Sequence, residues 1–205
     1  MQKTLFSLLL LMPLTLSAQS WHIAATGGVL LNTTTSKPVW YEKMSNKPGG
    51  AASIEAGYTR NRWEGGLSIS YRRYAVWHEG VIYVTDAYHP LGQPFDIKSL
   101  ETFPTLAITP FVRRHFGKGK ADFYTGINAG VATLPSGINT TFLGGDFRDR
   151  GETSPGFTAG IHGGCNYSIA KRWAVRTELS VDAVWLKTFS LQGSMFTAGV
   201  QYRIN

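Results

Sequence analysis

The chain has 205 residues, a length that fits one domain, and 16% of them are charged. Its single cysteine, Cys165, excludes an intramolecular disulfide, and its net charge of +7 is too modest and dispersed for a nucleic-acid-binding protein. Abundant glycine (23 residues) and aromatic residues (13%) are typical of an all-β architecture.

The first 18 residues, MQKTLFSLLLLMPLTLSA, have the pattern of a cleavable secretory signal peptide. One lysine precedes an apolar run over 5–16, and the segment closes on Ser17 and Ala18. A transmembrane anchor fits less well, because the run falls short of the roughly 18 residues that a membrane helix needs and Pro13 interrupts it. We therefore expect a signal peptide over 1–18 and one exported domain over 19–205.

After the signal peptide, apolar and polar residues alternate in eight segments, the period expected of half-buried β-strands. The clearest is WAVRTELSVDAVW at 173–185, which is longer than an ordinary strand of about six residues and has a tryptophan at each end of its apolar face. In chain order the expected strands are 20–31, 50–59, 62–77, 102–116, 121–133, 155–169, 173–186 and 193–204.

The connections between these strands alternate in length. The short ones follow the second, fourth and sixth strands, at 60–62, 117–120 and 170–172. The long ones follow the first, third and fifth strands, at about 32–49, 78–101 and 134–154. Tight turns at one end and long loops at the other predict the fold class: an all-β, eight-stranded antiparallel up-and-down transmembrane β-barrel.

The residue composition of the two strand faces indicates which face points into the barrel. One face is rich in large apolar residues, and the other carries glycine, serine, threonine and charges. An eight-stranded interior is just wide enough to be filled by side chains, too narrow for that many large apolar groups, so we expect the apolar face to meet lipid. Buried charges need partners of opposite sign, and the polar face carries four acidic residues and four arginines, which allows every charge to be paired. The expected lumen charge network is Glu55, Glu64, Arg72, Arg113, Arg176, Glu178, Asp182 and Arg203.

Two residues break the alternation, Arg73 on the apolar face and Phe111 on the polar face. We expect a β-bulge or a change of register near them. A secreted β-sandwich or a lipocalin-like barrel, with the apolar face as a core, is the alternative architecture.

Near the short turns, every expected strand carries an aromatic residue on its apolar face. Aromatic residues are enriched at membrane–water interfaces, so this set predicts a girdle. Its members are Trp21, Tyr58, Trp63, Phe116, Phe123, Tyr167, Trp173 and Tyr202. A sparser set marks the opposite interface: Trp77, Phe157, Trp185 and Phe196.

Taken together, these features resemble the small outer-membrane β-barrel proteins of Gram-negative bacteria. TPFVRRHF at 109–116 and YSIAKRWA at 167–174 look like strand ends and hairpins of the Bacteroidota type. The resemblance implies an outer-membrane location and contact with outer-membrane lipids. One departure is the C-terminus, QYRIN, whose last aromatic is Tyr202, whereas many such barrels end in an aromatic residue.

The sequence contains no clear catalytic or metal-binding motif. The five histidines form no HExxH motif or close metal pair, and no GxSxG marks a nucleophile. His78 and His89, with Glu79 and Asp86, leave loop metal binding open. The loop candidates for a lipid A-modifying enzyme are His78, His89, Asp86 and Ser99. We expect no enzyme activity, no cofactor and no metal.

Function then falls to the long loops, because loops on a rigid scaffold usually carry binding. The candidate binding residues are Trp40, Tyr41, Tyr83, Tyr88, Phe95 and Phe147. We expect a monomeric, non-enzymatic protein that supports the envelope or binds a surface protein or glycan, and that does not bind nucleic acid. The alternatives are a narrow channel for small solutes and a lipid A-modifying enzyme.

Overall fold

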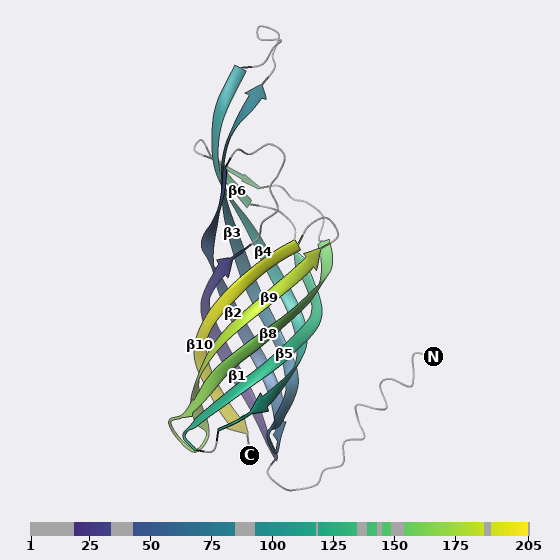
Figure 1. Cartoon of the computed structure of the whole chain (residues 1–205), viewed down its shortest axis with the longest axis vertical. Helices are drawn as coiled ribbons and strands as arrows, with labels where there is room; N and C mark the ends of the chain where they lie inside the picture. Colours follow the sequence, from purple (N-terminus) through teal and green to yellow (C-terminus); the bar gives the residue numbers. More distant parts are fainter. Residues whose placement is uncertain are drawn as a thin grey trace, which may run out of the picture.

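The computed structural model describes residues 19–33, 43–84, 93–117, 119–134, 139–142, 145–148, 154–186 and 190–204 (Figure 1). Eight long strands form the body of the molecule: β1 (Gln19–Asn32), β2 (Lys43–Arg60), β3 (Trp63–Val84), β4 (Gln93–His115), β5 (Ala121–Leu134), β8 (Ser154–Ser168), β9 (Trp173–Leu186) and β10 (Ser190–Ile204). Two short strands, β6 (Asn139–Phe142) and β7 (Gly145–Arg148), follow β5. Over these ranges no helix has the length and apolar character to cross a membrane.

The eight long strands close into a ring in which each pairs antiparallel with its neighbours. The order β3-β2-β1-β10-β9-β8-β5-β4 is completed by pairing of β3 with β4. Figure 1 shows the strands tilted around the barrel, with the C-terminus at the end that holds the tight turns. We call this end the turn end and the opposite one the far end. The predicted fold class is confirmed.

The register fixes the stagger of the barrel. From Leu31 of β1, successive partners lead through Ser194, Val181, Ile161, Ile127, Val112, Gly65 and Tyr58 back to Trp21 of β1. The path starts at residue 31 and returns at residue 21, so the shear is ten residues. Strand number and shear together set the tilt and the width of a barrel, and eight strands give an interior that side chains can fill.

The outer surface is apolar and the interior is polar over the turn-end part of the barrel. Leu179, Ile127 and Val131 are each more than 60% exposed, whereas Glu64, Arg113 and Arg176 are at most 1% exposed. The alternative with the apolar face as a core is therefore wrong.

The residues of the turn-end aromatic set lie on the outer face at one level of the barrel. Six of them are about half exposed: Trp21, Trp63, Phe116, Phe123, Tyr167 and Trp173. The two tyrosines, Tyr58 and Tyr202, are half-buried because they pack against Trp21 and Trp173, with ring centroids 5.0 and 4.9 Å apart.

At the far end, β2, β3 and β4 extend beyond the other strands of the ring. β3 and β4 pair without interruption from Trp63–Arg114 to Val84–Gln93. On one side, Lys43–Lys47 of β2 pairs with β3; on the other, β6 pairs with Ser99–Thr102 of β4 and β7 pairs with β6. Figure 1 shows β3 and β4 rising above the ring. We call this sheet the projection; most of it lies in segments predicted to be loops.

The irregularity expected near Arg73 lies in the partner strand. The β2–β3 register shifts between Lys47 and Gly50, opposite Ala75 and Arg73. A bulge adds a residue on one strand and bends it, and this one sits where the barrel gives way to the projection. Phe111, in contrast, lies in a regular register and is buried in the lumen.

Candidate functional site

Arg113 of β4 occupies the centre of the turn-end half of the lumen. A guanidinium has five N–H donors, and all five are used here. Nη1 donates to Glu55 Oε2 (2.7 Å) and Glu64 Oε1 (2.9 Å), Nη2 to Glu55 Oε1 (2.9 Å) and Glu178 Oε2 (3.0 Å), and Nε to His162 Nε2 (2.8 Å). The bidentate contact with Glu55 fixes the guanidinium plane.

A second guanidinium, that of Arg176 in β9, shares the same carboxylates. It donates to Glu55 and lies 3.7 Å from Glu64 Oε1. Its remaining contacts are neutral, from Nε to Asn166 Oδ1 (2.9 Å) and from Nη2 to Gln201 Oε1 (3.0 Å). Glu55 therefore bridges two arginines, which compensates the loss of hydration that a buried carboxylate suffers.

Histidines complete the charge balance near the turns. His115 places Nε2 2.9 Å from Glu64 Oε2 and Nδ1 2.7 Å from Asp122 Oδ2. An imidazole can donate to two carboxylates only as the imidazolium, so His115 acts as a third cation in this arrangement. His22 Nε2 lies 3.4 Å from the other Glu64 oxygen.

Aromatic rings pack on the charged centre. The Arg113 guanidinium lies 4.1 Å from the ring centroid of Phe111, and Tyr124 donates its hydroxyl to Glu178 Oε2 at 2.8 Å. Cation–π contacts strengthen when they are desolvated, which gives a reason for the inward position of Phe111.

These contacts form one connected layer across the lumen, which we call the ion-pair plate. Every strand of the ring contributes to it: His22 (β1), Glu55 (β2), Glu64 (β3), Arg113 and His115 (β4), Tyr124 (β5), His162 and Asn166 (β8), Arg176 and Glu178 (β9), and Gln201 (β10). The plate thus ties all eight strands together and fills the turn end of the tube.

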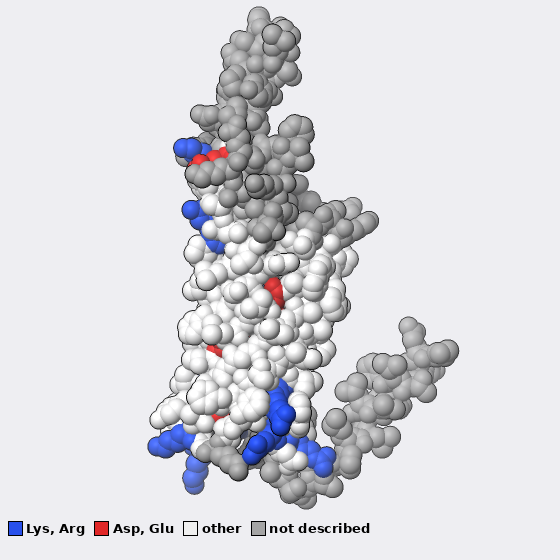
Figure 2. All heavy atoms as spheres, viewed as in Figure 1, with Lys and Arg blue, Asp and Glu red and all other residues white. Residues whose placement is uncertain are grey.

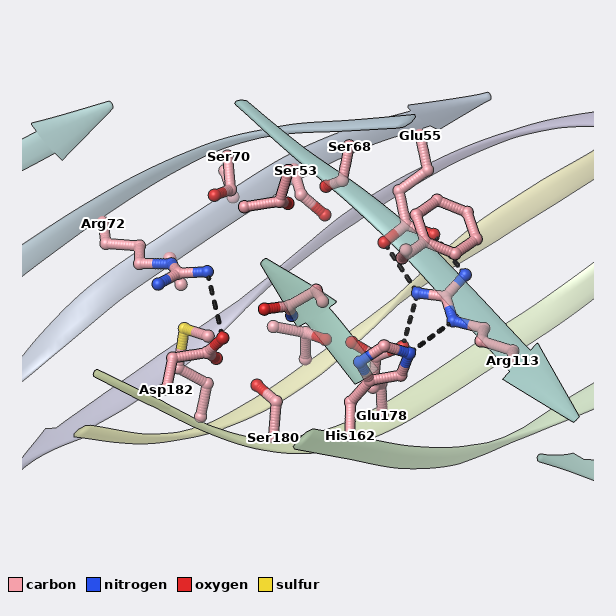
Figure 3. Close-up of a pocket in the computed structure, with 17 residues that line it drawn as sticks. Ser53, Glu55, Ser68, Ser70, Arg72, Arg113, His162, Glu178, Ser180 and Asp182 are labelled. Atoms are coloured by element: carbon pink, nitrogen blue, oxygen red, sulfur yellow. Dashed lines mark hydrogen bonds and ion pairs between the residues drawn. The ribbon is translucent and has the colours of Figure 1, made fainter. Parts of the chain in front are cut away.

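Arg72 and Asp182 form a separate pair farther from the turns. Arg72 Nη2 lies 3.4 Å from Asp182 Oδ1, and both side chains are at most 4% exposed. In Figure 3 this pair and the Arg113 cluster lie at opposite sides of a space edged by Ser53, Ser68, Ser70 and Ser180. The cavity volume there is about 40 Å³, enough for a few water molecules.

Beyond Arg72 and Asp182 the lumen becomes apolar. Tyr74 and Val184 lie two residues farther along the same strands and are fully buried. The cluster, which we call the apolar plug, consists of Leu30, Tyr74, Ala107, Ala132, Leu134, Val184, Leu186, Leu191 and Met195. The alternation of residues along the strands did not predict this plug, because the inward face of each strand carries both apolar and polar residues.

Lumen glycines face the large side chains of neighbouring strands. A Cβ at Gly57 would stand 2.4 Å from the His22 ring, and one at Gly160 would stand 2.1 Å from Asp182 Oδ1. Glycine therefore supplies the space that these side chains fill.

The predicted lumen residues divide into three groups. Five of the eight belong to the ion-pair plate: Glu55, Glu64, Arg113, Arg176 and Glu178. Arg72 and Asp182 form the separate pair, so the single network expected from a four-to-four balance is two clusters. Arg203 is half-buried at the end of β10 and makes no ion pair with another described residue.

The loop candidates lie mostly outside the described residues. Trp40, Tyr41 and Tyr88 are not described, and for Tyr83 (β3), Phe95 (β4) and Phe147 (β7) the backbone alone is placed, in strands of the projection. Val81–Val84, predicted to lie in a long connection, form the end of β3.

The candidates for loop chemistry are also incomplete. His89 and Asp86 lie outside the described residues, and only the backbone of Ser99 is placed, opposite His78. His78 Nε2 lies 3.1 Å from Glu101 Oε2. The described part of the chain holds no group of three or more His, Cys, Asp or Glu residues arranged to bind a metal ion.

Comparison with known proteins identifies the fold. No family model and no curated protein matches the sequence. Among solved structures, Neisserial surface protein A is similar with a TM-score of 0.56 and 14% identity over 92% of this chain and 100% of that one. OprH of Pseudomonas aeruginosa (TM-score 0.46, 15% identity, 90% and 99% coverage) and OprG of the same organism (0.44, 14%, 92% and 97%) also match. The chain has the fold of the small outer-membrane β-barrels.

Proposed function

We propose that this protein is exported by a signal peptide at 1–18, spans the outer membrane as one monomeric domain (19–205), and anchors the projection outside the membrane as a binding surface. The role is non-enzymatic. The similarity of 109–116 and 167–174 to Bacteroidota-type strand ends belongs to the same proposal.

The apolar belt supports the membrane-spanning part. Large apolar side chains cover the outer face, a surface that water would disfavour and lipid accommodates. Aromatic residues bound the belt at both ends; Phe157 and Trp185 stack at 5.8 Å near the far end. Outer-membrane lipids are the partner that this surface fits.

The observation that carries the binding role is the combination of a closed tube with a continuous β-sheet beyond it. The ion-pair plate and the apolar plug occupy the lumen of the described barrel at two levels, which supports a closed tube rather than a channel. β3 and β4 nevertheless remain paired out to Val84 and Gln93, well past the last β1–β2 pair, Leu31–Pro48. Ordering a long paired sheet costs conformational entropy. A sheet that extends beyond the barrel despite this cost favours a binding role outside the membrane.

Planar-bilayer recording tests the closed lumen. We expect no conductance steps from wild-type protein whose insertion is verified by a heat-dependent shift in gel mobility. Steps that change when Arg113 is substituted would support the channel alternative instead. Mass spectrometry of lipid A from cells with and without the protein tests the enzyme alternative, and we expect identical spectra.

Shortening the projection tests the binding role. A variant in which a two-residue turn replaces residues 81–97 keeps the whole ring of strands. On glycan and protein arrays, we expect wild-type detergent-folded protein to give discrete signals that this variant loses. If both proteins give the same signals while both show the heat-dependent shift, residues 81–97 of the projection are not the binding surface.

A further inference from the structure

The turn end of the barrel carries a basic collar. Its members are Arg62, Arg114, Lys120, Lys171 and Arg172, all exposed. They lie in or beside the three tight turns and therefore surround the barrel end. Figure 2 shows Lys and Arg gathered at this end of the molecule, where the C-terminus lies in Figure 1.

The backbone holds the collar in place through contacts between hairpins. The carbonyl of Arg62 accepts from His115 N, that of Lys120 from Ser168 N, and that of Arg172 from Arg203 N, each at 2.8 Å. Every bond joins a turn to a neighbouring strand. These bonds fix the backbone positions of Arg62, Lys120 and Arg172 at the barrel end.

Two collar arginines reach the aromatic girdle on the outer surface. The Arg114 guanidinium lies 5.6 Å from the Trp63 ring centroid and 5.7 Å from that of Phe116. Arg172 Nη1 donates to the Tyr202 hydroxyl at 3.3 Å. Girdle aromatics mark the level of lipid head groups, so these two cations lie at that level and face outward rather than into the lumen.

No acidic side chain in the described part of the chain neutralises the collar. None of its five members forms an ion pair with another described residue. The nearby carboxylates, Glu64 and Asp122, bind His115 instead. Near the far end the charges are mixed: Lys98 stands opposite Glu79 in the register, and Glu101 pairs with His78.

We propose that the basic collar binds anionic phospholipid head groups of the leaflet at the turn end. This inference rests on the proposed membrane-spanning function. Juxtamembrane basic residues attract anionic lipids, and the attraction falls off within a Debye length, so position at the head-group level matters. The collar combines that position with a net positive charge and a fixed backbone.

Tryptophan quenching by brominated lipids tests the proposal. The background variant Trp40→Phe/Trp77→Phe/Trp185→Phe leaves Trp21, Trp63 and Trp173 beside the collar as reporters. This protein is reconstituted in phosphatidylcholine vesicles that contain brominated phosphatidylglycerol or, in parallel, brominated phosphatidylcholine. At low salt we expect quenching to show a preference of about three- to fivefold for the anionic lipid, and a smaller preference in 0.5 M NaCl.

Matched variants assign the effect to the collar. Substitution of all five members by glutamine should reduce the preference to about onefold. The control Lys47→Gln/Arg73→Gln/Lys98→Gln removes charge near the far end and should leave it unchanged. Equal quenching by both lipids, in the three-tryptophan protein with an intact collar, would overturn the inference. It would leave the proposed membrane-spanning barrel unaffected. No quenching by either lipid overturns the membrane-spanning function and the collar with it.

Discussion

At the turn end the lumen is filled by ion-paired side chains, whereas toward the far end it is filled by apolar ones. The ion-pair plate draws on all eight strands through directional contacts, so it depends on the register of the whole ring. The apolar plug depends only on volume. One narrow tube is thus filled in two ways, by ion pairs at one level and by apolar packing at the other, and the two clusters should respond to different perturbations.

The largest expected effect is at the centre of the plate. Arg113→Ala leaves Glu55, Glu64 and Glu178 without their shared cation, and unpaired buried charge is strongly destabilising. We expect the free energy of unfolding to fall by about 3–5 kcal/mol, measured by urea titration of the protein in lipid vesicles.

The matched control is Arg203→Ala, which removes a half-buried arginine that makes no described ion pair. Its cost should stay below about 1 kcal/mol. Equal losses in the two variants would mean that the plate contributes no more than ordinary lumen packing.

The plug should respond to volume instead. Leu30 is fully buried, so Leu30→Ala opens a cavity, and we expect a loss of roughly 2–4 kcal/mol in the same titration. Leu179→Ala is the control, because that side chain is 64% exposed on the outer face and lipid can occupy the space. A cost at Leu179 as large as that at Leu30 would contradict the assignment of the plug as an internal seal.

A smaller effect is expected where the plate meets a lumen glycine. A Cβ at Gly126 would lie 2.5 Å from Val112 O and 2.6 Å from His162 Nε2, so Gly126→Ala must displace backbone or plate. We expect a loss of about 1–3 kcal/mol by urea titration.

Gly163, on the neighbouring strand, is the comparison for Gly126. A Cβ there would come no closer than 3.5 Å to Tyr124 O, an ordinary contact. Gly163→Ala should therefore be neutral within about 0.5 kcal/mol. If both alanines were neutral, the lumen would be looser than these distances imply.

Much of the fold was predictable from the sequence because a barrel strand has a simple signature. Period-two alternation located all eight strands, and for β9 the expected and observed bounds coincide at 173–186. The ends of β2, β3 and β4 at the projection were missed. Outside the barrel both faces of a sheet can be polar or apolar, so the alternation that marks a strand disappears.

The candidate site was predictable in part. Parity alone assigned lumen positions to the charged residues, since one face of each strand must point inward. It carried no information on how far each residue lies along the barrel axis. Arg72 and Asp182 were therefore grouped with Arg113, although a serine-lined space separates them.

By itself the sequence determined which face of each strand is lipid-like, how many strands cross, and which end carries the tight turns, because these follow from local periodicity and turn length. Only the tertiary structure decided which charges meet, that Phe111 packs under Arg113, and that an apolar cluster fills the lumen beyond them. The physical reason is the shear: a stagger of ten residues around the ring brings together side chains that are distant in sequence, such as Glu55 and Arg176.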